Sequence, residues 1–265
     1  MYDLAAIESA LAGTIFSGKL HFAPSTPSTN TDAMAAAVDG APHGSVWFAD
    51  EQTAGRGRGD HRWLSAAGEG LYVSVLLRPE CPLARLSLLP LAAGIAAAQA
   101  IREVAALPID LRWPNDLLIG PRKVGGILAE SQISSKSPPH AVAVVGIGIN
   151  VHQRSFAPGL ATPATSLDIE SGTRVSRQAL LIALLLSLER EAAALAAEEA
   201  AQRILSRIEQ RSTWVRHRNV SVHGPQACTG TTAGLDENGF LRVATAHGVV
   251  TVRTGGIRAA DGKIA

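Results

Sequence analysis

The sequence has little cysteine and almost no excess of charge. Two cysteines, Cys81 and Cys228, stand far apart in a chain of 265 residues, and no CxxC pair occurs. They predict neither a disulfide framework nor a zinc site, and they favour a reducing compartment. Lysine and arginine number 24 against 23 acidic residues, which gives a formal net charge of +1. Domains that mainly coat nucleic acid usually carry a strong basic excess, so this balance argues against that class.

Long hydrophobic runs and targeting signals are missing as well. The start, MYDLAAIESALAG, carries acidic residues and no basic region before an apolar core, so no secretory signal is predicted. The most apolar stretches begin at Leu86 and Ala179, and both are shorter than the roughly 20 apolar residues that span a membrane. We therefore expect buried core helices there, no membrane association and a cytoplasmic location.

Several familiar catalytic motifs do not occur. No HExxH or comparable histidine spacing predicts a zinc site, and no GxSxG predicts a nucleophile elbow. GRGRGD and GIGINV do not complete GxGxxG, which leaves a Rossmann dinucleotide site unsupported. GTIFSGKL is one residue from a P-loop, but Leu20 stands where a hydroxyl would have to bind Mg²⁺.

What the sequence does contain is a succession of helix and strand patterns. With 46% hydrophobic residues, the chain can form a sizeable core. Apolar periodicity predicts helices at 4–11, within 24–38, at 86–104 and as one pattern over 176–211. It predicts strands at 19–23, 44–52, 70–79, 109–119 with an interruption at Pro114, 123–130 and 141–151. After Trp214, short strands separated by Gly, Asn and Asp turns predict a small β-barrel, so we divide the chain into 1–217 and 218–265.

The loop EQTAGRGRGDHRW, from Glu51 to Trp63, alternates glycine and arginine. Glycine allows positive φ and lets backbone N–H groups turn toward an anion. Arg56 and Arg58 add planar donors that grip a carboxylate or a phosphate. The combination favours a mobile clamp for an anionic ligand. A solvated surface loop or an RGG-like RNA-binding segment stays open as the alternative.

Three further segments carry candidate chemistry. WPND ends at Asp116 and offers acceptors and a carboxylate for Mg²⁺ or an adenosine, or else it forms a plain Asx turn. Lys123 opens KVGGILAE, where its ammonium could neutralise developing charge in a partly dry pocket, or simply end a hairpin. Gly146 and Gly148 in GIGIN indicate close approach by a ligand or another backbone, with Asn150 as a polar reader; ordinary strand packing is the alternative.

PSTN near the start, EQTAGRGR with its following W, RWPNDLL with KVGGILAE, and GIGINV occur in this order and resemble a biotin–protein ligase. The resemblance runs from about Lys19 to the end of the chain. It implies an α+β fold with a mixed central sheet flanked by helices, like that of class II aminoacyl-tRNA synthetases, and a small C-terminal SH3-like β-barrel. Residues 1–217 would form the catalytic domain and 218–265 the barrel. Eighteen residues precede Lys19, too few for a DNA-binding module, so the stand-alone type without DNA binding is expected.

The resemblance also implies site residues, carried over motif by motif. Biotin binding falls on Ser28, Thr29, Asn30, Gln52, Arg56, Gly57, Arg58, Lys123, Gly125 and Gly126. ATP binding falls on Arg58, Trp63, Asn115, Asp116, Lys123 and Asn150. Catalysis falls on Arg56, Arg58, Asp116 and Lys123. No metal-ligand set in the protein is predicted, and Mg²⁺ is expected with ATP. The chain departs from the family pattern after the second arginine, where Gly59, Asp60 and His61 replace a further basic residue and glycine, and Asp60 puts negative charge near the clamp.

The activity implied is ATP-dependent biotin–protein ligation. Biotin would be activated as biotinyl-5′-AMP and passed to a lysine of the biotin carboxyl carrier protein of acetyl-CoA carboxylase. We expect a monomer or weak homodimer, and a loop that is flexible when empty and pinned by bound adenylate. A lipoate or octanoate ligase or transferase of the same superfamily, a nucleic-acid-binding protein and an inactive biotin sensor are the alternatives, although GRGR and KVGGIL favour biotin.

Overall fold

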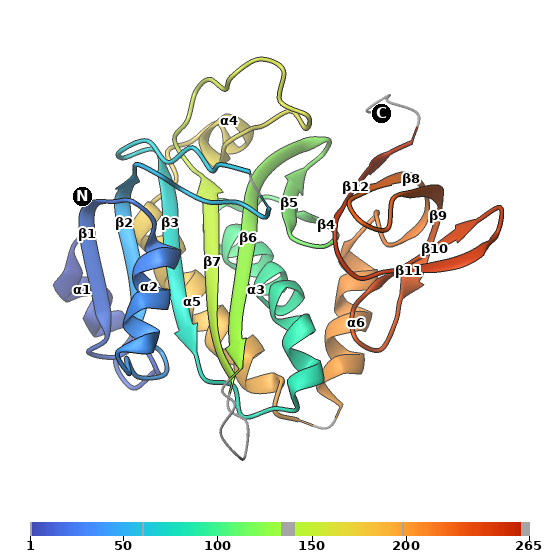
Figure 1. Cartoon of the computed structure of the whole chain (residues 1–265). Coiled ribbons are helices and arrows are strands. Elements are labelled where there is room, and N and C mark those ends of the chain that lie inside the picture. The colour runs from blue at the N-terminus through green and yellow to red at the C-terminus, as the bar shows by residue number, and fades with distance from the viewer. Residues whose placement is uncertain (1, 60, 134–140, 198, 261–265) are drawn as a thin grey trace.

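The computed structural model describes residues 2–59, 61–133, 141–197 and 199–260, which form two sheets and their helices (Figure 1). The first sheet contains β1 (Leu20–Thr26), β2 (Val46–Gln52), β3 (Gly70–Leu77), β4 (Asp110–Arg112), β5 (Asp116–Ile119), β6 (Arg122–Ile133) and β7 (Ala141–Asn150). Its order is β1-β2-β3-β7-β6-β5-β4, with β1 and β2 parallel and the other neighbours antiparallel. The predicted α+β class with a mixed central sheet is confirmed.

Helices cover both faces of this sheet (Figure 1). They are α1 (Leu4–Ala10), α2 (Thr29–Val38), α3 (Leu89–Ala105) after a 3₁₀ turn η1 (Leu83–Leu88), α4 (Leu167–Ser171), α5 (Arg177–Ala194) and α6 (Ala200–Arg211). Consecutive strand residues face opposite sides. On β7, Val145 and Ile147 therefore join the main core with α3 and α5, whereas Val144 packs with Ala33 of α2 on the other face.

The apolar run that ends in α3 is a core helix, as predicted. Residues Leu83–Ala105 are long and apolar enough to cross a membrane, but 67% of their most apolar window is buried inside the structure. Small side chains let α3 lie close to α5 and to the back of β6. A Cβ at Gly94 would have Ile127 and Leu111 as its nearest neighbours. The helix is therefore accounted for by packing.

The prediction of one helix over 176–211 is wrong. Ser176 does cap the start, since its Oγ accepts a hydrogen bond from the Ala179 amide at 3.2 Å. The helix ends at Ala194, and α6 begins at Ala200. Arg85 Nη1 donates to the carbonyls of Leu195 and Ala197, at 3.0 and 2.7 Å, and so satisfies carbonyls that the helix leaves open. No glycine or proline marks this break in the sequence. The short helix α4 was also not predicted.

The second sheet contains β8 (Arg216–His223), β9 (Cys228–Leu235), β10 (Leu241–Thr245), β11 (Gly248–Val252) and β12 (Gly256–Ala259), all antiparallel. It lies beside β4 and α6 (Figure 1). Trp113 Nε1 donates to the Gly239 carbonyl at 3.0 Å, and Ser87 Oγ donates to the Asn238 carbonyl at 2.7 Å. These bonds fix the second sheet to the WPND segment and to the turn before α3. The boundary after residue 217 stays a prediction.

Candidate active site

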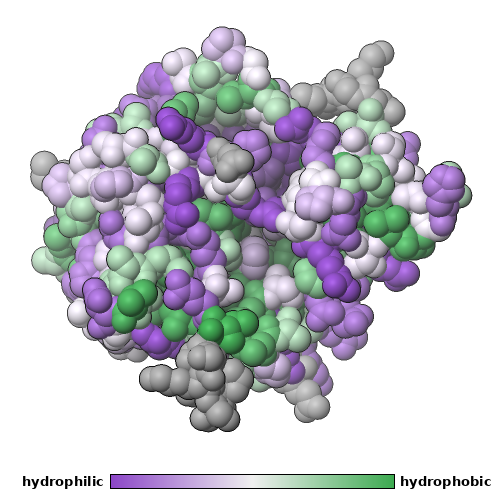
Figure 2. Space-filling model, viewed as in Figure 1, coloured by the Kyte–Doolittle hydropathy of each residue, from purple (hydrophilic) through white to green (hydrophobic). Residues whose placement is uncertain are grey.

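Residues from all four motifs meet on one face of the first sheet, opposite α3 and α5. Gly146, Gly148 and Asn150 alternate along β7 on this face. A Cβ at position 146 would lie 2.2 Å from Asn30 Oδ1, and a Cβ at position 148 would lie 2.6 Å from Trp63 Nε1. The close approach predicted at these glycines is present, but side chains of the chain itself make it. Hydrophilic residues surround a hollow in the middle of this side of the molecule (Figure 2).

The Gly/Arg loop is folded back on itself as a narrow hairpin. The Gly57 amide donates to the His61 carbonyl at 2.7 Å, and the Trp63 amide donates to the Gly55 carbonyl at 2.9 Å. A Cβ at Gly55 would lie 2.4 Å from the Trp63 carbonyl oxygen, so glycine is needed there for the two arms to meet. His61 is exposed. Asp60, with its predicted effect on the clamp, lies outside the described residues.

A hydrogen-bond network connects the PSTN segment to the loop. Asn30 Oδ1 accepts from Ser74 Oγ at 2.7 Å, and the hydroxyls of Ser74 and Thr29 are 2.8 Å apart. Gln52 Oε1 accepts from the Thr29 amide at 2.9 Å, and Gln52 Nε2 donates to Ser65 Oγ at 2.8 Å. The structure thus brings three predicted biotin-binding residues together. Ser65 and Ser74 are both buried in this network, and no motif in the sequence marked either of them.

Arg56 is paired with a carboxylate that the sequence analysis missed. Its guanidinium donates to both oxygens of Glu130, at 3.1 and 2.6 Å. Asn30 Nδ2 donates to the same carboxylate at 2.7 Å. Glu130 therefore joins the loop to the PSTN segment and holds the charge of Arg56. Strand alternation could have identified it, because Glu130 lies on the same face of β6 as Gly126.

Arg58 points toward the second sheet. Its Nη1 donates to the Gly255 carbonyl at 2.7 Å, and its Nη2 donates to Thr254 Oγ1 at 3.5 Å. Burial lowers the pKa of the Arg58 guanidinium from its ordinary value, while the negative charge of Asp116 acts in the opposite direction. The loop is thus held on one side by β6 and on the other by the turn between β11 and β12.

Asp116 lies between two cations. Arg112 donates to Asp116 Oδ2 through Nε and Nη2, at 3.1 and 2.6 Å, and Lys123 forms an ion pair with Oδ1. Burial raises the pKa of the Asp116 carboxyl, but Lys123 and Arg112 outweigh burial and hold that pKa below its ordinary value. The Lys123 ammonium also lies 5.5 Å from the centroid of the Trp63 ring. The carboxylate, the lysine and the loop tryptophan therefore form one contiguous group.

Comparisons with known proteins show the family of the chain. A model of the Biotin/lipoate A/B protein ligase family matches residues 22–150. The biotin–[acetyl-CoA-carboxylase] ligase of Mycobacterium tuberculosis is 32% identical over 238 residues, which cover 88% of this chain and 85% of that protein. The chain belongs to the biotin protein ligase family.

Two further relatives bear on the fold and the length. The biotin protein ligase of Aquifex aeolicus, solved in complex with biotin and ATP, is similar with a TM-score of 0.76 and 29% identity, over 91% of this chain and 98% of that one. The bifunctional ligase/repressor BirA of Bacillus spizizenii is 40% identical over 165 residues, or 62% of this chain. The chain spans about half the length of that repressor, since the match covers 50% of it.

In this biotin protein ligase fold, three of the predicted site residues hydrogen-bond to the backbone, and a fourth lies beside the core; their predicted ligand contacts stay predictions. Asn115 Nδ2 donates to the Ile127 carbonyl at 2.7 Å, and Asn150 Nδ2 donates to the Thr165 carbonyl at 3.0 Å. Ser28 caps α2. A Cβ at Gly125 would point at Leu117 and Ile149 in the core, away from the loop, whereas one at Gly126 would point at Lys123 and Trp63.

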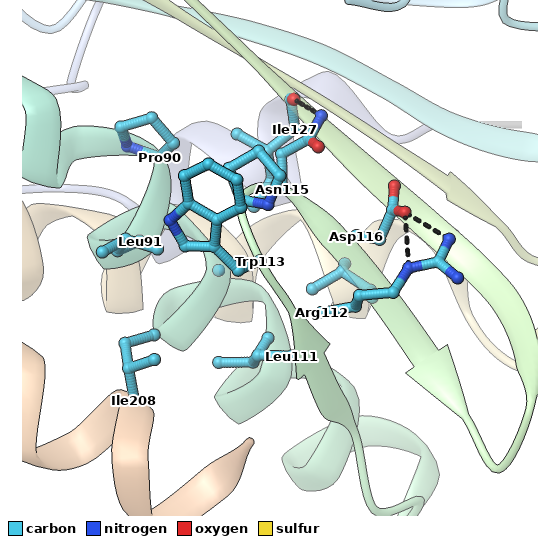
Figure 3. Close-up of a pocket in the computed structure, with 12 residues that line it drawn as sticks. Pro90, Leu91, Leu111, Arg112, Trp113, Asn115, Asp116, Ile127 and Ile208 are labelled. Atoms are coloured by element: carbon cyan, nitrogen blue, oxygen red, sulfur yellow. Dashed lines mark hydrogen bonds and ion pairs between the residues drawn. The ribbon is translucent and has the colours of Figure 1, made fainter. Parts of the chain in front are cut away.

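An apolar recess lies behind the WPND turn (Figure 3). Its lining includes Pro90, Leu91, Gly94, Leu111, Trp113, Leu117, Ile127 and Ile208, together with Arg112, Pro114, Asn115 and Asp116. Figure 3 shows the Arg112–Asp116 pair at one side of this group and the Trp113 ring with Pro90 and Leu91 at the other. Because most of the lining is apolar and comes from these elements, we assign the recess to packing between α3, β4 and α6.

Proposed function

We propose that the chain is an ATP-dependent biotin–protein ligase, which forms biotinyl-5′-AMP and transfers the biotinyl group to a lysine of a biotin carboxyl carrier protein. The observation that carries this proposal is the group made by Lys123, Asp116 and Trp63 on the same sheet face as Asn30. The Trp63 indole Nε1 is buried and has no hydrogen-bond partner among the described residues. Such a donor suits a polar ligand atom.

In the first step, a carboxylate oxygen of biotin attacks the α-phosphorus of ATP. The bond from that phosphorus to the bridging oxygen breaks, and pyrophosphate leaves with the electron pair. Negative charge grows on the phosphoryl oxygens, so a fixed ammonium near them lowers the barrier. Lys123 supplies that ammonium, and Asp116 fixes its position through the ion pair. Glu130 neutralises the charge of Arg56. Arg56 therefore helps to order the biotin pocket and supplies no free charge to this step.

In the second step, the lysine ε-amine of the carrier attacks the acyl carbon of the mixed anhydride. The amide bond forms, AMP leaves, and the amine loses a proton. Water would attack the same carbon, so the intermediate must be covered between the two steps. The Gly/Arg loop, with Trp63 packed on Gly148 and Gly126, is the part of the site suited to this cover.

We further propose that Mg²⁺ enters with the triphosphate. Within the described residues no group of three or more His, Cys, Asp or Glu side chains could hold a metal ion, and Asp116 is already engaged by two cations. A metal site made by the protein does not fit these residues, and no step is assigned to one. The same proposal includes four further points. The second sheet is SH3-like, and its domain begins at residue 218. The protein is a monomer or weak homodimer that does not bind DNA, and its location is cytoplasmic.

The test is to incubate the protein with ATP, Mg²⁺, biotin and an isolated carrier domain, and then to weigh the carrier. A mass gain of one biotinyl group that requires ATP supports ligation, and an unchanged carrier mass with no ATP–pyrophosphate exchange contradicts it. A parallel incubation with lipoate tests the superfamily alternative. That alternative is not favoured, since the relatives described above are named for biotin.

Arg58→Ala is expected to release biotinyl-5′-AMP faster, by roughly tenfold or more, because a hydrogen bond to a charged group contributes about 1.5–3 kcal/mol. The loop would lose both a phosphate contact and its bond to the Gly255 carbonyl. The measurement is the dissociation of adenylate in a single-turnover assay. Arg62→Ala is the matched control, since Arg62 lies on the same loop and is exposed. An unchanged release rate in Arg58→Ala would remove the latch role.

A further inference from the structure

Arg112 is a buried residue with no assigned part in the proposed reaction. Only 8% of the residue is exposed. Two of its nitrogens donate to Asp116 Oδ2, and Nη2 also donates to Thr162 Oγ1 at 2.9 Å. With Nε and Nη2 directed at protein oxygens and almost no exposed surface, Arg112 is not placed to contact a substrate. Its effect on the chemistry has to pass through the carboxylate.

The carboxylate in turn controls the lysine. Asp116 uses one oxygen for Arg112 and the other for Lys123, so the rotation of its carboxylate group is fixed from both sides. A guanidinium that donates two hydrogen bonds to one oxygen holds it more rigidly than an ammonium, because the donors of its planar group are preorganised. If this group were lost, the carboxylate could turn, and the Lys123 ammonium would follow it along the flexible lysine stem.

Arg112 is itself held by the segment that leads into the second sheet. Its guanidinium carbon lies 5.2 Å from the centroid of the buried Trp214 ring, and that of Arg218, on β8, lies 4.0 Å from the same centroid. Asp110 of β4 accepts from the Thr213 amide at 3.0 Å and from the Thr213 hydroxyl at 2.6 Å. The start of the second sheet is thus attached directly to the strand that carries Arg112.

We propose that Arg112, braced by Trp214, is a positioning residue that sets the place of the Lys123 ammonium through Asp116. The inference rests on the proposed function, because it assigns Lys123 to adenylate formation. It also gives the second sheet a role in the first step: Arg218 and Trp214 keep Arg112 in place. A displacement of about 1 Å at a reacting group can cost on the order of a hundredfold in rate, so such a brace has measurable consequences.

The test is a double-mutant cycle between Arg112 and Lys123, read by the single-turnover rate of biotinyl-5′-AMP formation and by the dissociation constant for biotin. Arg112→Met is expected to lower the rate by about tenfold or more while biotin affinity changes little. Arg112→Lys should recover part of the rate. In a Lys123→Met background, Arg112→Met should have almost no further effect, because the group through which it acts is gone.

Thermal unfolding and a matched variant separate positioning from general destabilisation. Arg216→Met makes the same arginine-to-methionine change at a more exposed ion pair, with Glu209, at the start of β8, where no site residue is involved, and it should leave the rate unchanged. A further loss of rate when Arg112→Met is added to Lys123→Met, equal to its loss alone, would overturn the proposal. So would a parallel loss of rate, biotin affinity and melting temperature. Failure of the unmodified protein to form the adenylate would instead refute the proposed function.

Discussion

Lys123→Met is expected to reduce the rate of biotinyl-5′-AMP formation by about 10²–10³-fold, the usual cost of removing one preorganised group that stabilises transition-state charge. The ammonium lies beside Asp116 and 5.5 Å from the Trp63 ring centroid, on the face where the loop and the PSTN segment meet. The variant should still fold, since Asp116 keeps two hydrogen bonds from Arg112. Single-turnover formation of adenylate from ATP and biotin measures the effect.

Arg122→Met is the matched control for this prediction. Arg122 is the neighbour of Lys123 at the start of β6, but its half-exposed side chain pairs with Glu170 outside the site. Because this pair involves no residue of the candidate site, the variant should keep nearly the full rate. If Lys123→Met formed adenylate as fast as Arg122→Met, the charge on Lys123 would have no part in the first step.

Local sequence patterns were sufficient for most elements because each depends on a few neighbouring residues. Alternation in GLYVSVLL marks β3, the apolar run AVAVVGIGIN marks β7, and the serine at position 176 marks the start of α5. Glycine at position 55 and arginine at 56 and 58 also predict a loop that binds an anion, and that binding stays a prediction. These patterns do not give the register between neighbouring strands, and that register decides which side chains contact one another.

Three outcomes show the effect of register. Gly125 and Gly126 were both assigned to biotin, yet consecutive residues of β6 face opposite sides, and a Cβ at Gly125 would meet the core. Glu130 was passed over, although it lies on the face of Gly126 and pairs with Arg56. The Arg58 contact with Gly255 joins residues 197 positions apart, one in the loop after β2 and the other in the turn between β11 and β12. No local motif contains that information, because it arises only when the second sheet packs beside the first.

Both arginines of the Gly/Arg loop have partners within the chain, which bears on how the loop would close. The sequence predicts that Arg56 and Arg58 bind an anionic ligand. In the structure, Glu130 forms an ion pair with Arg56, and the Gly255 carbonyl accepts a hydrogen bond from Arg58. In the proposed reaction, adenylate binding would replace the hydrogen bond from Arg58 to the Gly255 carbonyl with a contact to the ligand.

Gly148→Ala is expected to impair the ATP-dependent step with little effect on the core. The added methyl would lie 2.6 Å from Trp63 Nε1 and 2.7 Å from Cε2, so the indole has to move. Because the Trp63 amide is bonded to Gly55, the shift would carry the loop hairpin with it. Overpacking of this kind costs about 1–3 kcal/mol, which corresponds to roughly 5- to 150-fold if it appears wholly in the barrier. The measurement is the dependence of adenylate formation on ATP concentration.

Gly126→Ala provides the control at the paired position on β6. Gly126 lies opposite Gly148 in the ladder, and a Cβ there would meet the Lys123 side chain at 3.4 Å and the Trp63 ring at 3.6 Å, both ordinary contacts. The same methyl group is thus added on the same face of the same sheet, but only position 148 forces the indole to move. If both variants lost activity equally, bulk on this face would be the cause, and the placement of Trp63 would not be what the reaction depends on.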